Sequence, residues 1–179
     1  MQTLSNDFLD ALRECVGEAN LLTGESECWS YGYDNSRRHC LPQAVAFATS
    51  HPQVLQIVRL CNRYWVPLTT RGRGTGTTGA TVPLQGGLVL SLERMNQILR
   101  IDPENRLMLV EPGVTNQAVQ DAAAGHGVFW PPDPTTAAFC STGGDLAPHS
   151  AGPRCGTSGP RRTTTHRSRA TPAHDAAHS

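Results

Sequence analysis

The sequence contains no lysine, since all 15 of its basic residues are arginine. A Walker phosphate loop needs Gly-Lys-Ser or Gly-Lys-Thr, so this class of nucleotide site is excluded. None of the six cysteines forms a Cys-x-x-Cys pair, which argues against a disulfide framework or a metal site. We expect reduced, mostly buried thiols. The polar residues 1–7 are no signal peptide and no apolar run could cross a membrane, so we expect a cytoplasmic protein.

Residues 148–179 lack Val, Ile, Leu, Met, Phe, Trp and Tyr altogether and therefore cannot bury a core. They hold five arginines against one acidic residue, a net charge of +4, whereas residues 1–147 hold ten arginines against 14 acidic residues, a net charge of −4. We expect this tail to be disordered, and our hypothesis is that it is translated out of frame. The competing interpretation is an arginine-rich arm for nucleic acid. We favour the first and expect no nucleic-acid partner, because no aromatic platform accompanies the arginines.

The remaining residues predict alternating helices and strands. Apolar residues spaced along one stripe predict a helix from Phe8 to Val16, capped by Ser5 or Asn6. After it come a predicted strand over 44–48, a helix over 52–64 capped by Thr49 or Ser50, and a strand over 66–70. Further strands are predicted over 88–90, 98–101, 107–110 and 128–130, with a turn over 102–105 and a helix over 117–124 capped by Thr115. This order favours a mixed α/β (α+β) fold.

A glycine-rich segment follows the strand over 66–70 directly. Residues 71–79 contain four glycines, whose backbone N–H groups can turn inward and form a nest for phosphate oxygens. The alternative is a flexible connection between two strands. The spacing of Gly72, Gly74 and Gly76 does not match the Rossmann pattern, and the residues that follow do not resemble the start of a helix.

Five ordered motifs place this segment in a wider pattern. They are residues 67–76, 83–91, 110–114, 131–134 and 143–144. Together they closely resemble the PCMH-type FAD-binding domain of the vanillyl-alcohol-oxidase family, and within it the glycolate oxidase flavoprotein subunits and D-lactate dehydrogenases. The resemblance covers roughly residues 4–147 and implies the N-terminal subdomain of an incomplete FAD-binding domain. We divide the chain into a helix and connecting segment at 1–41, a partial FAD-binding domain at 42–147 and the tail at 148–179.

The resemblance implies roles for two sets of residues. The pyrophosphate of FAD would be lined by Arg71, Gly72, Arg73, Gly74, Thr75 and Gly76. A second wall near the ribityl chain and flavin would be formed by Asp133, Pro134, Thr135, Ser141, Gly143 and Gly144. Thr75 stands where relatives with covalently bound flavin carry histidine, which implies non-covalent FAD. Asp145 stands where the family usually has asparagine, and a carboxylate there would weaken phosphate binding unless it faces away.

The same resemblance implies a flavoprotein oxidoreductase that acts on the CH–OH group of a 2-hydroxy acid, glycolate or D-lactate, and yields the 2-oxo acid. Family members bind the 2-hydroxy acid as substrate, and other oxidase subunits are candidate partners. The substrate-holding groups and the catalytic base belong to a later region of the family, so we name no catalytic residue and no metal ligand. We expect this truncated chain to be inactive by itself. The alternative is an inactive fragment that serves as a nucleotide-binding or subunit-association module.

Overall fold

The computed structural model describes residues 3–132 and 136–147. These residues form two compact units, of which the first ends at Arg94 and the second begins at Met95. Asp133, Pro134 and Thr135, together with the tail at 148–179, lie outside the described residues.

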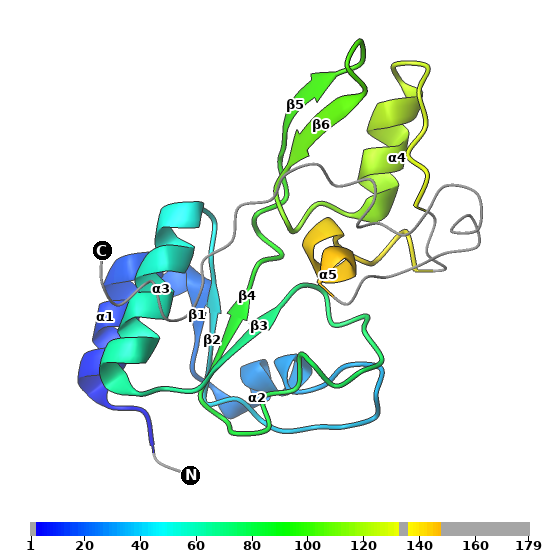
Figure 1. The fold of residues 1–179 in the computed structure, drawn as a ribbon. Helices are drawn as coiled ribbons and strands as arrows, with labels where there is room; N and C mark the ends of the chain where they lie inside the picture. The colour runs from blue at the N-terminus through cyan, green and yellow to red at the C-terminus, as the bar shows by residue number, and fades with distance from the viewer. Residues whose placement is uncertain (1–2, 133–135, 148–179) are drawn as a thin grey trace. The chain divides into compact units, whose positions relative to one another are not determined.

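The first unit contains a four-stranded sheet with the order β1-β2-β4-β3 (Figure 1). Its strands are β1 (Leu21–Leu22), β2 (Ala44–Phe47), β3 (Leu68–Arg71) and β4 (Leu88–Ser91). β1 runs antiparallel to β2, whereas β2 and β3 both run parallel to β4. Every residue of β2 and β4 is buried, which is expected of parallel strands that are covered on both faces.

Helices α1 (Asn6–Val16) and α3 (His51–Tyr64) pack against each other on one side of this sheet (Figure 1). The predicted apolar stripe of α1 is buried at Phe8, Leu12 and Val16, and the Phe8 ring lies 5.6 Å from the Tyr64 ring. Ser5 caps α1, because Phe8 N donates to its side-chain oxygen at 3.3 Å. The prediction of this helix and of one of its two candidate caps is therefore confirmed.

The segment between α1 and β2 covers the other face of β2. It contains the short helices η1 (Glu18–Asn20), α2 (Glu25–Cys28) and η2 (Trp29–Tyr31). Along β2, Val45 and Phe47 alternate with Ala44 and Ala46, so the two pairs face opposite sides of the sheet. Val45 and Phe47 share a buried cluster with Cys28 and Val89, and Leu22, Tyr31 and Leu41 pack against it.

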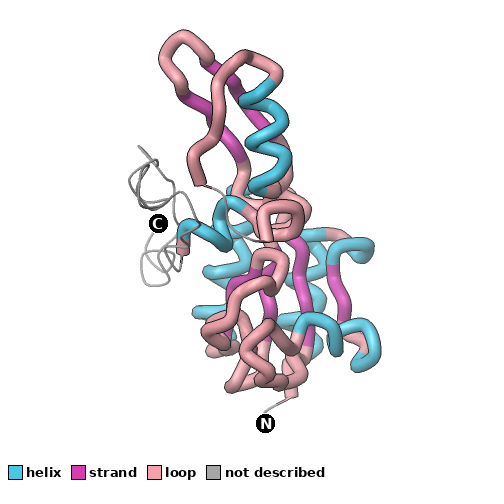
Figure 2. Tube along the Cα trace, turned by 90° about the vertical axis from the view of Figure 1, so that its right-hand side faces the viewer, coloured by secondary structure: helices cyan, strands magenta, loops and turns pink. Residues whose placement is uncertain are grey.

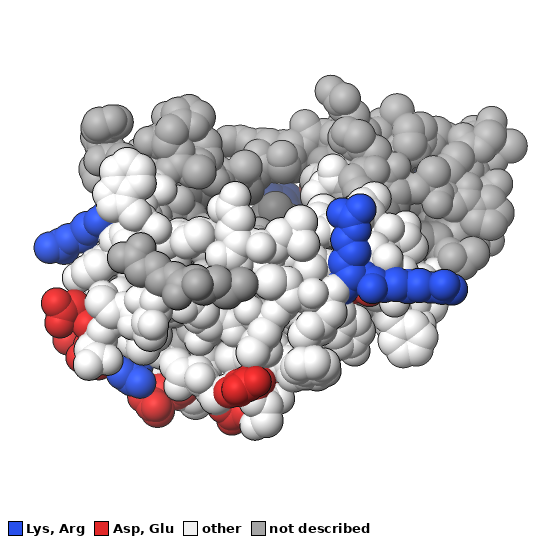
Figure 3. Space-filling view, turned by 90° about the horizontal axis from the view of Figure 1, so that it is seen from below, with Lys and Arg blue, Asp and Glu red and all other residues white. Residues whose placement is uncertain are grey.

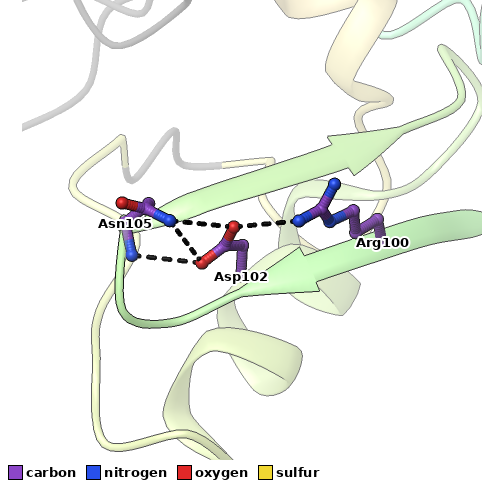
Figure 4. Close-up of polar contacts among 3 residues, drawn as sticks. All are labelled: Arg100, Asp102 and Asn105. Carbon is purple, nitrogen blue, oxygen red and sulfur yellow. Dashed lines mark hydrogen bonds and ion pairs between the residues drawn. The ribbon is translucent and has the colours of Figure 1, made fainter.

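The second unit contains a two-stranded antiparallel sheet of β5 (Ile98–Asp102) and β6 (Leu107–Val110), and helices α4 (Asn116–Ala124) and α5 (Thr142–Leu146). Figure 2 shows the hairpin and α4 side by side. The predicted cap of α4 is confirmed, since Ala118 N donates to the Thr115 hydroxyl at 3.2 Å. The predicted turn is confirmed as well: Asp102 accepts hydrogen bonds from Asn105 N and Nδ2, each at 3.1 Å, and from Arg100 at 3.2 Å (Figure 4).

One predicted strand is wrong. Residues 128–130 have no strand partner within the described chain and adopt no regular structure. Instead they are tied to α4: Val128 N donates to Ala123 O at 3.2 Å, and Trp130 Nε1 donates to Asn116 Oδ1 at 2.7 Å. The apolar run predicted a strand, but the Trp130 indole is anchored through its polar edge to the helix.

Five of the six cysteines lie in the described part of the chain. Cys15, Cys28, Cys40, Cys61 and Cys140 are free, and three of them, Cys28, Cys61 and Cys140, are buried. Burial raises the pKa of Cys61 to about 12, and burial together with Glu27 raises that of Cys28 to about 11. Among the described residues no helix is long and apolar enough to span a membrane. Figure 3 shows charged side chains of both signs on one face of the described chain.

Candidate functional site

The glycine-rich segment, residues 71–79, begins at the last residue of β3 and continues into the loop of residues 72–87, which joins β3 to β4 and contains neither helix nor strand. It leaves the sheet at Arg71, which is paired with Ser91 in the register of the two parallel strands. Gly74 and Gly79 adopt left-handed backbone conformations, with φ of 68° and 80°. Residues with a Cβ atom adopt this conformation reluctantly, so glycine is required at both turns of the loop.

The backbone N–H groups of residues 72–78 are the open donors of this loop. Within the described chain, none of them donates a hydrogen bond. The next amide behaves differently, because Gly79 N donates to Asp34 Oδ2 at 3.0 Å. Residues 76–78 are also exposed. Consecutive backbone amides without acceptors are the kind of donor set that binds phosphate oxygens, so this loop fits a pyrophosphate group.

The carbonyl groups in the middle of the loop are bonded. Asn35 N donates to Gly76 O at 2.8 Å, and Asn35 Nδ2 donates to Thr75 O at 3.2 Å. In a planar trans peptide the C=O group and the following N–H group point in opposite directions. The N–H groups of Gly76 and Thr77 therefore point away from Asn35.

The Arg71 side chain is turned into the protein and is 7% exposed. Its Nη1 donates to Tyr33 O at 2.5 Å and to Tyr31 O at 3.3 Å, while its buried Nε has no acceptor in the described chain. Gly74 lies against this guanidinium so closely that a Cβ at that position would come within 2.6 Å of the guanidinium carbon. The side chain thus fastens the start of the loop to residues 31–33, and a phosphate-binding role for Arg71 stays a prediction.

Aromatic rings and a carboxylate surround the same guanidinium. Its carbon lies 5.4 Å from the centre of the Tyr31 ring and 6.0 Å from that of Tyr33. The Tyr31 hydroxyl donates to Glu93 Oε1 at 3.2 Å. Burial lowers the pKa of Arg71 and Glu93 opposes that change, so the guanidinium keeps its charge at neutral pH. Burial, and then Glu93, raise the pKa of Tyr31, which keeps its hydroxyl a donor.

Asp34 fastens the far end of the glycine-rich segment. Its carboxylate is 3% exposed and accepts from Ser36 N at 2.9 Å, from Gly79 N at 3.0 Å and from the Thr81 hydroxyl at 3.4 Å. Burial raises the pKa of Asp34, but the hydrogen bonds from Ser36, Gly79 and Thr81 outweigh it, so the pKa lies below its ordinary value. Asp34 is therefore ionised at neutral pH, and both of its carboxylate oxygens accept hydrogen bonds from its own chain.

Two further loop residues are accessible to a ligand. Arg73 is exposed and forms no ion pair among the described residues, so its positive charge is uncompensated by the chain. A Cβ built on Gly76 would meet no atom of the described residues within 4 Å. The space beside Gly76 is thus open, in contrast to the space beside Gly74.

The second predicted set of site residues lies in the second unit. Ser141 precedes α5 and caps it, since Gly144 N donates to the Ser141 hydroxyl at 3.3 Å. Gly143 N donates to Pro112 O at 2.9 Å, and a Cβ on Gly143 would come within 2.6 Å of Pro112 Cβ. The structure thus brings the motifs at 110–114 and 143–144 together. Asp145 is 5% exposed.

Sequence reasoning missed the residues that hold the loop. Asp34 and Asn35 lie in a polar segment for which the sequence predicted no role, about forty residues before the loop in the chain. The run Asp34-Asn35-Ser36 does carry a local signal, because such side chains often bond nearby backbone amides. That signal predicts a turn, but it does not reveal which distant segment the turn contacts.

Comparison with known proteins identifies the family. Residues 42–171 match the family model described as FAD binding domain, so the chain belongs to this family. The match extends past Ala147, where the recognisable motifs had ended. The predictions of the family and of a PCMH-type α/β fold are confirmed.

Relatives are found among 2-hydroxy-acid oxidoreductases. Glycolate oxidase subunit GlcD of Escherichia coli (strain K12) is 38% identical over 148 residues, which cover 82% of this chain and 30% of the relative. D-lactate dehydrogenase of Anaerostipes hadrus is 39% identical over 114 residues, which cover 63% of this chain and 24% of the relative. The chain thus spans less than a third of the length of these relatives.

Solved structures agree on the fold. A structure of p-cresol methylhydroxylase superimposes with a TM-score of 0.69 at 28% identity and covers 82% of this chain and 30% of that one. A structure of alkyldihydroxyacetonephosphate synthase superimposes with a TM-score of 0.81 at 21% identity and covers 88% of this chain and 34% of that one. The second likeness shows the shared fold alone.

Proposed function

We propose that this chain is the FAD-binding front part of an oxidoreductase that converts a 2-hydroxy acid, glycolate or D-lactate, to the 2-oxo acid. The observation that supports it most is the row of open amide donors at residues 72–78 in a member of the FAD binding domain family. The similarity to a glycolate oxidase subunit and to a D-lactate dehydrogenase supports the substrate class.

In this proposal the amides of residues 72–78 and the exposed guanidinium of Arg73 hold the pyrophosphate of FAD. Backbone donors and one flexible cation suit two linked phosphates, because the amides fix geometry and the cation adds charge. Ser141, Gly143 and Gly144 would form a second wall. Since the amides of Gly143 and Gly144 are already bonded within the chain, that wall would contribute shape more than hydrogen bonds. The proposed wall also includes Asp133, Pro134 and Thr135, which lie outside the described residues.

We further propose that FAD is bound without a covalent link. Thr75 is half-buried, its carbonyl is bonded to Asn35, and its hydroxyl is a poor attachment point for a flavin compared with the histidine of covalent relatives. When bound, FAD supplies the hydride acceptor, and the protein supplies binding and orientation. The chain's own contribution is to bind and orient; we assign no catalytic base to it.

The isolated chain should not turn over a 2-hydroxy acid, since it spans less than a third of its relatives. A second role is subunit association, which is favoured by exposed apolar side chains in the second unit: Leu99, Leu107, Leu109, Phe129 and Phe139. Co-purification with a full-length glycolate oxidase flavoprotein subunit tests this role. If the chain stays unbound when the two proteins are mixed at equal concentrations, the role is refuted. The cytoplasmic location, supported by free thiols, and the out-of-frame tail remain part of our proposal.

The first test is FAD uptake by the full 179-residue chain, measured as the visible flavin spectrum after gel filtration and as quenching of flavin fluorescence on titration. Gly76→Ala should weaken FAD binding about tenfold or more without destabilising the chain, because its new Cβ enters space that no described residue occupies and that the phosphates would need. Gly125→Ala is the matched control: Gly125 has a helical φ of −60° and lies in the second unit at the end of α4. Unchanged FAD affinity in Gly76→Ala, or equal losses in both variants, would refute the loop assignment.

A further inference from the structure

A short segment, residues 31–36, contacts the glycine-rich segment, residues 71–79, at its beginning, its middle and its end. Arg71 Nη1 at the beginning bonds to the Tyr31 and Tyr33 carbonyls. Asn35 bonds the two carbonyls in the middle, and Asp34 bonds the Gly79 amide at the end. Residues 71–79 are therefore attached along their length to a segment that precedes them by about forty residues.

The segment is itself held in shape by local bonds. Ser36 N donates to Asp34 Oδ1 at 2.9 Å, and Cys40 N donates to Gly32 O at 2.9 Å. Tyr33 and His39 form an isolated antiparallel bridge. Tyr31, at the start of the segment, packs its ring edge-on against Phe47 of β2 with 5.4 Å between ring centres. The support thus reaches back to the buried sheet and is more rigid than a free loop.

The contacts are selective for one side of the loop backbone. In the middle of the loop, Asn35 engages carbonyl oxygens only, those of Thr75 and Gly76. Because each peptide is planar and trans, fixing these oxygens on the Asn35 side directs the amides of Gly76 and Thr77 to the other side. Asp34 engages an amide, and that amide belongs to Gly79, where the run of open donors stops.

We propose that Asn35 and Asp34 are positioning residues that preset the loop, with Asn35 turning the amides of Gly76 and Thr77 toward the FAD pyrophosphate and Asp34 ending the donor row at Gly79. This inference rests on the proposed function. A donor row that is ordered before binding avoids the entropy cost of ordering it during binding. Neither side chain needs to touch FAD for this role.

The experiment compares two exposed asparagines. Asn35 and Asn105 each donate through both the backbone N–H and the side-chain amide, but Asn105 serves the β5–β6 turn in the second unit. Asn35→Ala should weaken FAD binding about tenfold, since it removes a loop contact, whereas Asn105→Ala should leave affinity within about twofold. Asn35→Gln, which keeps an amide donor, should recover part of the affinity. Melting temperatures are measured for all three variants.

A second readout separates this inference from the proposed function. Backbone order of residues 72–78 is measured by NMR relaxation in the full chain without FAD, where Asn35→Ala should reduce order and Asn105→Ala should not. Wild-type affinity in Asn35→Ala, or unchanged loop order, overturns the positioning role even if the wild type binds FAD. If the wild type takes up no FAD, the proposed function fails, and the order measurement alone decides whether Asn35 positions the loop.

Discussion

The two glycine-containing segments of the candidate site differ in how they use their backbone. In the loop of the first unit, the amides of residues 72–78 have no acceptor within the described chain and the carbonyls of Thr75 and Gly76 are bonded. Before and within α5 in the second unit, the amides of Gly143 and Gly144 are bonded to Pro112 and Ser141. Glycine content alone does not distinguish them.

This difference separates two uses of glycine. At Gly143 the missing Cβ allows close packing, because Pro112 occupies the space that a side chain would need. At Gly76 the missing Cβ leaves space that no described residue fills. The first glycine serves the fold and the second leaves room for a ligand. Substitution by alanine should therefore lower stability at Gly143 and FAD affinity at Gly76.

The largest expected effect is on stability at Gly143. Gly143→Ala should destabilise the second unit by about 3 kcal/mol, because the rigid Pro112 ring stands 2.6 Å from the added Cβ. Gly76→Ala should change stability by less than about 0.5 kcal/mol. Urea unfolding followed by hydrogen exchange and mass spectrometry assigns each loss to its unit. Similar losses at the two glycines would remove the contrast between packing and binding.

A smaller effect is expected at Asp34, which is buried and holds the loop. Asp34→Asn should destabilise the first unit by about 2 kcal/mol at neutral pH, since the amide cannot accept all the bonds that the carboxylate accepts. The pKa of Asp34 is lowered in the folded chain, so its contribution is complete above its ordinary pKa and is lost as pH falls through the folded value. Wild type and variant should converge in thermal melts once the pH lies below the folded pKa of Asp34. A difference that grows in acid would contradict this assignment.

The smallest effect is expected at Asp102, which holds the β5–β6 turn from the surface (Figure 4). Hydrogen bonds from Asn105, and then Arg100, lower the pKa of Asp102. Asp102→Ala should therefore lower the melting temperature slightly at neutral pH, and the difference should vanish in acid as the wild-type carboxylate is protonated. Faster hydrogen exchange confined to residues 98–110 is the signature to look for. A stability loss as large as that of Asp34→Asn would mean that burial does not explain the difference in stability contribution between Asp34 and Asp102.

Local patterns predicted most of the fold. Ser5 and Thr115 cap the helices they were expected to cap, and the strands predicted over 44–48, 66–70 and 88–90 correspond to β2, β3 and β4 within one or two residues. Each of these predictions depends on residues within one turn or one strand. The failure at 128–130 arose because Trp130 bonds to Asn116, a contact that apolar periodicity does not encode.

The candidate site was predicted less completely. The glycine-rich loop and its family were recognisable from its motifs, but the inward orientation of the Arg71 side chain was not. That orientation depends on carbonyls of Tyr31 and Tyr33, about forty residues away, and on the absence of a Cβ at Gly74. The supporting residues Asp34 and Asn35 escaped notice for the same reason, since their partners become neighbours only after the sheet has formed.

The strand order has a consequence for how the first unit is made. β4 lies between β2 and β3 although it follows both in the chain, and β2 and β3 do not pair with each other. As the polypeptide leaves the ribosome, three α-helices and three strands emerge before the strand that joins them. Until Ser91 is added, β3 has no partner strand and β2 is paired only with the two-residue β1. A nascent chain that stops before Leu88 therefore exposes strand edges, and the sheet can form only after β4 has been synthesised.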